Sequence, residues 1–352
     1  MAYSAIIKPT DYFNTILHTG TGSAASLTGV GFEPSMVWAK QRNGTDNNNT
    51  VDAVRGVQKI IQSDTDTQEQ TSSGSITSFD SDGFSVGTDN AWNGTSNTYV
   101  MWNWKASGAG SSNEDGSINT TATSVNTTAG FSISTYTGTG SNATVGHGLG
   151  VVPKMIMVKR LDSSSDWRVY HSAAGAGSPA TKQLFLNRNV AEDDDNTIWN
   201  DTAPTSSVFT VGTNTGSNAS AGTYVAYCFA EKTGYSKFGA YVGNGSTNGT
   251  FTYTGFKPAF VMVKYASPGG GVGNWGIFDS VRNPTNVVTK GLLANSTAAE
   301  DTSDFINIVS NGFKQKSAST NRNEDGSTYI FMAFAENPFV ANVGGGLPTT
   351  AR

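Results

Sequence analysis

Charged side chains are scarce in this sequence, and long apolar runs are missing. Asp, Glu, Lys and Arg make up 14% of the 352 residues, against about 25% in an average soluble protein. A formal net charge of −5 leaves no strongly basic face, so we expect no nucleic acid partner. No apolar run approaches the roughly 18 residues of a membrane-spanning helix, so we expect no membrane insertion.

Cysteine and histidine are also rare. Cys228 is the only cysteine, which excludes an internal disulfide and a cysteine-clustered zinc site. Its apolar surroundings, residues 224–229, predict a buried structural thiol. The three histidines, His18, His147 and His171, show no metal-ligand spacing, and we expect each to be hydrogen-bonded in a turn or sheet. The first eight residues have neither the basic start nor the apolar core of a signal peptide, which predicts synthesis in a cytoplasm.

Glycine is abundant, with 41 residues, and it marks an internal repeat. Each of three copies opens with a Gly-rich turn, continues to a proline before an apolar strand that ends in lysine, and closes on an aromatic strand that begins Thr-Tyr. The prolines are Pro34, Pro153 and Pro258, the lysines are Lys40, Lys159 and Lys264, and the closing tyrosines are Tyr99, Tyr224 and Tyr329. From proline to tyrosine the chain advances 65 residues in the first copy (34 to 99) and 71 in the second (153 to 224) and third (258 to 329). This order of marks predicts three diverged copies of one unit of about a hundred residues.

Each copy contains short apolar runs separated by Gly/Asn/Ser/Asp turns, which is typical of a β-sandwich or jelly roll. The sequence therefore predicts an all-β protein of three tandem antiparallel β-sandwich, jelly-roll-like domains with very little helix. The expected units are residues 1–106, 130–234 and 235–340, with a Gly/Ser/Thr/Asn-rich linker at 107–129 and a flexible tail at 341–352. Only residues 54–62 and 297–308 have a pattern that could hold a helical turn or two.

Two glycine motifs resemble catalytic or phosphate-binding signatures. Residues 83–87, Gly-Phe-Ser-Val-Gly, match the nucleophile elbow of hydrolases, which requires a sharp turn from a strand into a helix. Here the segment lies in a β pattern and is followed by a loop, so we predict no hydrolase. Residues 138–143 resemble the dinucleotide fingerprint, but they lead to another strand instead of a helix, and we interpret them as a turn.

Acidic loops and two tryptophans are the remaining candidates for a ligand-binding site. Asn321–Gly326 has the oxygen spacing of a calcium loop but lacks its final glutamate, because Met332 stands there. The sequence leaves open whether this turn or the acidic loop Glu192–Asp195 binds a divalent ion. Trp92 and Trp199 lie in polar loops, and we predict that they are exposed and contact glycans. The core is expected to hold the other five tryptophans, Trp38, Trp102, Trp104, Trp167 and Trp275. We predict no catalytic residues, no metal ligands and no cofactor.

The whole chain resembles a family of bacteriophage virion structural proteins, found largely in marine phages and built from tandem β-sandwich repeats. The segments that carry this resemblance are Lys8–Thr15, Gly29–Pro34, Gly146–Gly150, Asn295–Glu300, Phe331–Phe339 and Gly346–Arg352. The resemblance implies a tail-fibre-like or capsid-attached appendage located in the virion and synthesised in the host bacterial cytoplasm. It transfers no catalytic residue.

From this resemblance we expect a non-enzymatic structural protein that contributes to host-surface attachment. Its expected partners are other virion proteins, further copies of itself in a homotrimer, and a host surface glycan. The first copy lacks the Ala-Glu pair that the other copies have at Ala191-Glu192 and Ala299-Glu300, and it ends in Trp102-Asn103-Trp104-Lys105, which suggests a particle anchor. The alternative is a carbohydrate-binding, lectin-like module. A glycan depolymerase is disfavoured because the carboxylates recur mainly as isolated turn residues.

Overall fold

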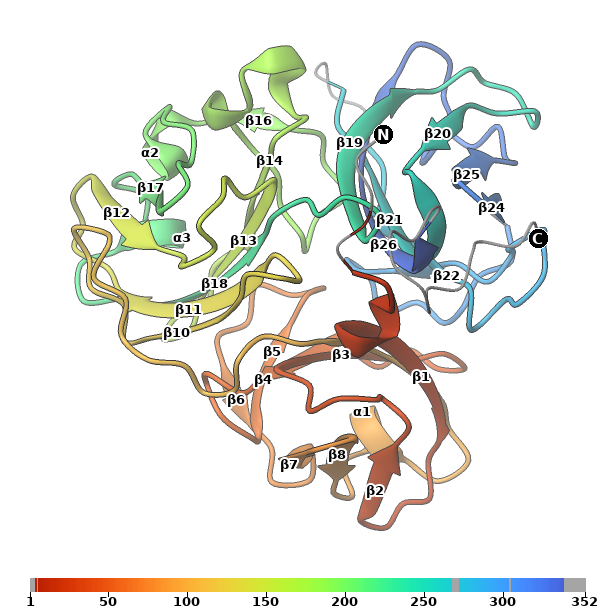
Figure 1. The fold of residues 1–352 in the computed structure, drawn as a ribbon, viewed down its shortest axis with the longest axis horizontal. Coiled ribbons are helices and arrows are strands. Elements are labelled where there is room, and N and C mark those ends of the chain that lie inside the picture. The colour runs from red at the N-terminus through yellow and green to blue at the C-terminus, as the bar shows by residue number, and fades with distance from the viewer. Residues whose placement is uncertain (1–3, 5, 268–271, 304, 339–352) are drawn as a thin grey trace.

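The structure is a computed structural model that describes residues 4, 6–267, 272–303 and 305–338. The predicted tail, 341–352, lies outside these residues. Strands account for 42% of the chain and helices for 6%, so the fold is nearly all β and built of antiparallel sheets, as predicted. Each sequence copy forms one lobe, and the lobes surround a common junction (Figure 1).

The first lobe has a large and a small antiparallel sheet. The large sheet runs in the order β1 (Phe13–Thr19), β9 (Thr98–Trp104), β3 (Met36–Gln41), β4 (Asn49–Asp52), β5 (Lys59–Gln62) and β6 (Gln70–Thr71). The small sheet runs in the order β2 (Ala25–Thr28), β8 (Gly83–Val86) and β7 (Ile76–Asp80). The closing strand of the copy, β9, therefore lies between the opening strand and the proline-preceded strand.

The other two lobes repeat this order. In the second lobe the large sheet is β10 (Ala122–Asn126), β11 (Phe131–Thr137), β18 (Thr223–Phe229), β13 (Met155–Arg160) and β14 (Arg168–His171), and the small sheet is β12 (Ala143–Gly146) and β17 (Val208–Val211). A separate pair joins β15 (Lys182–Gln183) to β16 (Asp193–Asp194). In the third lobe the large sheet is β19 (Ser236–Val242), β26 (Thr328–Pro338), β21 (Phe256–Tyr265), β22 (Gly276–Asp279) and β23 (Leu292–Leu293), and the small sheet is β20 (Phe251–Tyr253), β25 (Gly312–Gln315) and β24 (Ile306–Val309).

Helices are short and lie outside the two stretches expected to hold them. They are η1 (Pro9–Asp11), α1 (Asn90–Asn93), η2 (Gly175–Gly177), η3 (Pro179–Thr181), α2 (Asn196–Trp199) and α3 (Thr215–Asn218). The expected stretches contain strands instead, β5 within 54–62 and the start of β24 within 297–308. None of the helices in the described residues has the length and apolar character that a bilayer span requires.

The linker predicted at 107–129 is wrong in part, because this segment contains β10. This strand extends the large sheet of the second lobe by pairing with β11. Upstream of it, Ile118 bridges to Val145 of β12, and the Ser117 hydroxyl accepts from the Thr144 N–H at 2.9 Å. Threonine has a high strand propensity, and a composition that indicated a loose connection instead forms β10 and a strap that pairs with β12 at the edge of the small sheet.

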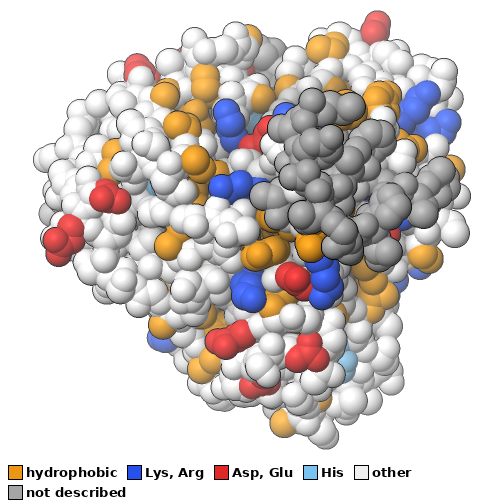
Figure 2. All heavy atoms as spheres, in the orientation of Figure 1, with side chains coloured by type: hydrophobic (Ala, Val, Ile, Leu, Met, Phe, Trp, Pro, Cys, Tyr) orange, Lys and Arg blue, Asp and Glu red, His pale blue; other side chains and the backbone are white. Residues whose placement is uncertain are grey.

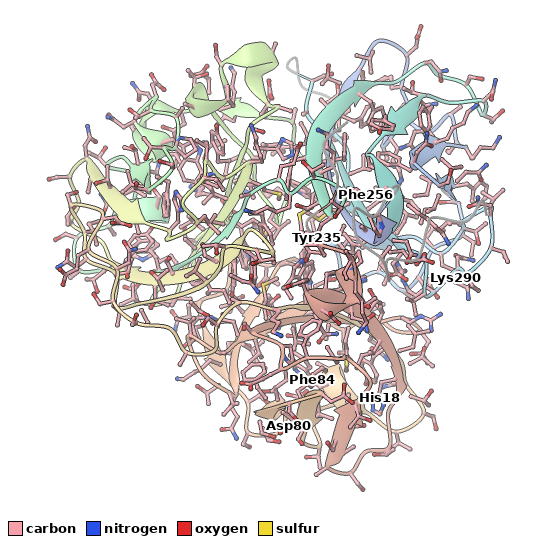
Figure 3. All side chains as sticks on the ribbon, viewed as in Figure 1. His18, Asp80, Phe84, Tyr235, Phe256 and Lys290 are labelled. Atoms are coloured by element: carbon pink, nitrogen blue, oxygen red, sulfur yellow. The ribbon has the colours of Figure 1, made fainter. Side chains whose placement is uncertain are left out.

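Each lobe has a core of its own, and a further central cluster joins all three lobes, so the prediction of three tandem sandwich domains is not confirmed. In β3, Val37 and Ala39 face the core of the first lobe, whereas Met36 and Trp38 face the junction. The same alternation in the other large sheets brings buried apolar residues of all three lobes into a single central cluster. Figure 3 shows Tyr235, a member of this cluster, close to where the lobes meet, and Phe84 within the first lobe. Strands that are apolar on both faces must be covered on both faces.

All five tryptophans predicted to be core residues are buried, and each has at most 2% of its surface exposed. Cys228 is also buried, as predicted. The small sheets lie on the side of each lobe away from the junction (Figure 1). Figure 2 shows a face dominated by uncharged polar side chains and backbone, with charged side chains scattered.

Candidate functional site

Trp92 and Trp199, the predicted glycan contacts, are buried, so the prediction that they are exposed is wrong. Trp92 is 0% exposed and packs in the core of the first lobe. Trp199 is 2% exposed and packs against the Tyr170 ring at 6.1 Å. Their polar neighbours cap short helices: Asp89 accepts from the Ala91 N–H, and Asp195 does the same for Thr197. The polar residues beside each tryptophan therefore serve to cap a short helix. The indole rings themselves point into the core.

The acidic loops engage their carboxylates in local contacts. Asp194 pairs with Lys182 at 2.7 Å, and Glu192 accepts from the Gly175 N–H at 2.9 Å. In the turn at 321–326, Asn323 is buried and bonds to the backbone of the opening turn of its own copy. Within the described part of the chain, no group of three or more His, Cys, Asp or Glu residues is placed to hold a metal ion.

The histidines form hydrogen bonds within the lobes and between them. In His171 the Nδ1 atom accepts from the Ala173 N–H at 3.2 Å, so Nε2 carries the proton and donates to the Phe331 carbonyl at 3.1 Å. Burial lowers the pKa of His171 to about 4, which keeps the ring neutral. His147 repeats this arrangement with Leu149 and the Thr205 carbonyl, and His18 lies 2.9 Å from Asn93 Oδ1.

The serine of the elbow-like motif, Ser85, lies in β8, in an antiparallel sheet. Its hydroxyl donates to Asp80 Oδ2 at 2.9 Å. A strand-to-helix turn is absent at this position, because β8 pairs with β2 and β7 along its length. The structure therefore leaves the predicted glycan residues in different lobes and places Ser85 within a strand, not at a strand-to-helix turn.

What the structure does bring together is a set of buried polar contacts between neighbouring lobes. We call the place where two lobes meet through such contacts a joint. At the end of the apolar strand of each copy, a lysine ammonium lies among three carbonyls, at least one of them on a neighbouring lobe. Lys40 Nζ donates to Gln41, Gly44 and Thr297 at 2.8–3.2 Å. Lys159 Nζ donates to Asp66, Arg160 and Ser165 at 2.9–3.1 Å. Lys264 Nζ donates to Asn189, Val190 and Gly273 at 2.6–3.1 Å.

These lysines are structural residues. All three are 0% exposed, and burial lowers the pKa of Lys40 and Lys159 to about 8 and that of Lys264 to about 7. A buried lysine of lowered pKa can act as a nucleophile. Here three carbonyl acceptors match the three donors of the ammonium and no surface of the residue is open, so each lysine ties one lobe to the next.

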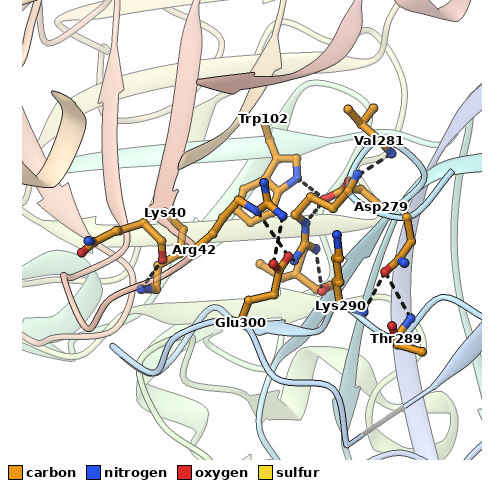
Figure 4. Close-up of polar contacts among 12 residues, drawn as sticks. Lys40, Arg42, Trp102, Asp279, Val281, Thr289, Lys290 and Glu300 are labelled. Atoms are coloured by element: carbon orange, nitrogen blue, oxygen red, sulfur yellow. Dashed lines mark hydrogen bonds and ion pairs between the residues drawn. The ribbon is translucent and has the colours of Figure 1, made fainter. Parts of the chain in front are cut away.

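Two joints also contain a buried Asp–Arg pair that receives an aromatic donor from a neighbouring lobe. Between the third and first lobes, Arg282 Nε lies 2.5 Å from Asp279 Oδ2, and Trp102 Nε1 donates to the same oxygen at 3.1 Å. Glu300 bridges Arg282 and Arg42 at 3.1 and 3.0 Å (Figure 4). This network joins β22 to the first lobe without an exposed charge at its centre.

The joint between the first and second lobes has the same form. Arg55 Nε lies 2.5 Å from Asp52 Oδ2, and the Tyr227 hydroxyl donates to that oxygen at 2.6 Å. Burial raises the pKa of Tyr227 well above its ordinary value, so the hydroxyl stays protonated. The corresponding position of the third copy is Met332, and that joint uses neutral His171 instead.

A pocket of about 310 Å³ opens at the joint of the first and third lobes. Its lining includes Thr15, Lys257, Val281 and Glu336. By strand register, Thr15 corresponds to Ile133 and Phe238 in the other lobes, so the smaller side chain leaves space there. Lys257 pairs with Glu336 at 2.8 Å, and Glu336 is the one carboxylate among the lining residues.

The other unusual surface is the outward side of the small sheet in the third lobe. Phe251 and Tyr253 of β20 are 47% and 56% exposed, whereas Thr252 between them is buried. Register places Ser26 and Thr28 at these positions in the first lobe, and Thr144 and Gly146 in the second. We call Phe251, Tyr253 and their cross-strand neighbour Lys314 the aromatic face.

Sequence reasoning missed the aromatic face because it concentrated on tryptophan. The available signal was the alternation Phe-Thr-Tyr, in which the central threonine aligns with the inward-facing Leu27 and Val145 of the other copies. Alternation places the flanking residues on the opposite side of the strand. Aligning the short β20 run with those strands would have indicated two outward aromatic rings.

A family model matches residues 8–338, which span all three lobes. Its description is "Domain of unknown function (DUF7483)", and the chain belongs to this family. No curated protein matches the sequence. One model covers the three lobes as a single unit, in agreement with their shared core.

Proposed function

We propose that the chain is a non-enzymatic structural protein of a bacteriophage particle, a tail-fibre-like or capsid-attached appendage that contributes to host-surface attachment. The observation that carries this proposal is that ionisable side chains in the joints are buried and make hydrogen bonds that hold the lobes together. Lys40, Lys159 and Lys264 are buried and bonded to backbone carbonyls between lobes. A scaffold closed in this way resists salt, because buried pairs are screened far less than surface pairs.

The three lobes give the proposed appendage different surfaces around one buried centre. The first copy, with Trp104 and Lys105 in place of the Phe-Ala of the other copies, is proposed as the anchor to other virion proteins. The third lobe, with its aromatic face, is proposed as the exposed end. Association into a homotrimer remains part of the proposal.

The test is the location of the protein. Particles released by a host that carries the gene should contain the chain in a fixed copy number relative to the major capsid protein, as measured by mass spectrometry of density-purified virions. Cryo-EM of the same particles should show three-lobed density at an appendage. Virions that lack the chain, with the protein left in the lysate, would overturn the proposal.

A free carbohydrate-binding module is the second candidate, and the exposed rings of Phe251 and Tyr253 favour it. It no longer has the residues first predicted for it, since Trp92 and Trp199 are buried. Location separates the two candidates: a free lectin-like protein would be absent from virions and would still bind glycans.

A further inference from the structure

We propose that the aromatic face of the third lobe is an oligosaccharide-binding site, in which Phe251 and Tyr253 stack on sugar rings and Lys314 donates to sugar hydroxyls. This inference rests on the proposed attachment role, because it names the class of receptor that the exposed lobe would meet. Nothing in the buried joints or in the pocket is required for it.

The geometry begins with two rows of side chains across the small sheet. Phe251 lies opposite Lys314, which lies opposite Asn307, and all three are on the outward side because Thr252, Phe313 and Ile308 of the next row are buried. Lys314 Nζ donates to Asn248 Oδ1 at 2.6 Å. An apolar ring beside an ammonium and amide groups suits a ligand that is apolar on one face and rich in hydroxyls at its rim, as a pyranose ring is.

The second row leaves room beside the rings. Tyr253 lies opposite Gly312, where an added Cβ would meet the Phe251 ring at 3.1 Å and the Thr252 carbonyl closer still. A glycine at this position therefore allows the Phe251 ring to lie close against the sheet. Two rings at i and i+2 on one strand are roughly 7 Å apart, a spacing that lets neighbouring sugars of one chain contact both.

The exposed area distinguishes a sugar from a protein partner. Phe and Tyr side chains bury about 150–250 Å² each when fully covered. With 47% and 56% exposed, the two rings offer about 200 Å² together. A standard protein interface needs about 800 Å² per partner. The aromatic face is thus too small for a stable protein interface, and it is large enough for two or three sugar rings.

The second lobe shows why a strand of protein is not the occupant. There, the segment around Asn113 to Ile118 covers the equivalent strand, β12. An added Cβ at Gly146 would lie 1.6 Å from the Asn113 amide oxygen, so a larger residue at that position would displace the Asn113 side chain. Tyr253 takes the place of Gly146 in the third lobe, and its ring would occupy the space that such a covering segment needs.

The experiment uses the purified full chain on a printed array of bacterial surface oligosaccharides, followed by saturation-transfer NMR with the best soluble hit. Wild type should retain at least one array component, with saturation transferred to ring C–H protons. Phe251→Ser and Tyr253→Thr, which install the residues of the first lobe, should each weaken binding about tenfold. The matched control pair, Ser26→Ala and Thr28→Ala at the equivalent positions of the first lobe, should leave binding unchanged.

Three outcomes would overturn the inference: no array component retained by wild type, equal binding by the wild type and both third-lobe variants, or loss of binding in the first-lobe control. Unchanged thermal unfolding of Phe251→Ser ensures that a loss reports the site. Because the array uses isolated protein, its result is independent of location. A chain found in virions that binds no glycan loses only this inference, and a glycan-binding chain that is absent from virions loses only the proposed particle role.

Discussion

The junction of the three lobes and their outer small sheets differ in how similar the copies are. At the junction, Lys40, Lys159 and Lys264 are the same residue and make the same kind of contact with three carbonyls. On the outer sheets, one outward position carries Ser26, Thr144 and Phe251. Closure around the central cluster constrains the inner positions of all copies, whereas each outer sheet faces solvent or a strap of its own lobe and can change independently.

Removing a buried charge partner at the junction should have the largest effect. Asp279→Ala leaves Arg282 buried without its closest carboxylate and deprives Trp102 Nε1 of its acceptor. The free energy of unfolding should fall by about 3–5 kcal/mol, measured by urea denaturation. The double variant Asp279→Leu, Arg282→Met should lose less, because no uncompensated charge stays in the joint. A single variant within 1 kcal/mol of wild type would show that the joint does not hold the lobes together.

The joint between the second and third lobes, which contains His171, should lose stability in acid. His171 has a pKa of about 4 in the fold against 6.5 when unfolded, so the unfolded chain binds more protons between these values. Stability contributed by neutral His171 is therefore present above pH 6.5 and is lost as the pH falls towards 4. Its size is on the order of 3 kcal/mol. Denaturation midpoints of wild type and His171→Gln across this range should converge at low pH; parallel curves would contradict the prediction.

A smaller loss of stability is expected when the Tyr227 hydroxyl, which donates to Asp52, is removed. Tyr227→Phe keeps the ring and removes the hydrogen bond donated to Asp52 and the longer one accepted from Arg55 Nη2, which should cost about 2 kcal/mol. Met332→Leu, at the position where the third copy has no donor, is the matched control and should cost less than about 1.5 kcal/mol. Equal losses in both variants would mean that ring packing, and not the hydrogen bond, stabilises this joint.

The smallest effect is expected on the outer sheet. Phe251→Ser replaces a half-exposed ring by the residue of the first lobe, so the free energy of unfolding should change by at most about 0.5 kcal/mol. Thermal unfolding of this variant beside Asp279→Ala tests the contrast directly. A large loss of stability in Phe251→Ser would show that the aromatic face serves packing.

Particular residues show how far the sequence could lead. The sequence predicted the proline-preceded strand and the closing aromatic strand of each copy, and the buried state of Trp38 and Trp167, because apolar runs and their spacing are local properties. Trp92 was placed wrongly, since its polar neighbours indicate a loop but cannot say whether a ring in that loop turns inward. The strap at 107–129 was missed because Ser and Thr serve both loops and strands.

The sequence by itself determined the nearly all-β character, the three copies and the lysine near the end of each apolar strand. Which residues those strands and lysines contact was decided only by the tertiary structure. Strand runs apolar on both faces are compatible with separate sandwiches or with a shared core, and the choice depends on whether the second face finds another lobe. The carbonyl that receives Lys40 is that of Thr297, from another copy far along the chain. The same packing left Phe251 and Tyr253 exposed on the outer side, because the inward positions of their sheet were already filled by Thr252 and Phe313.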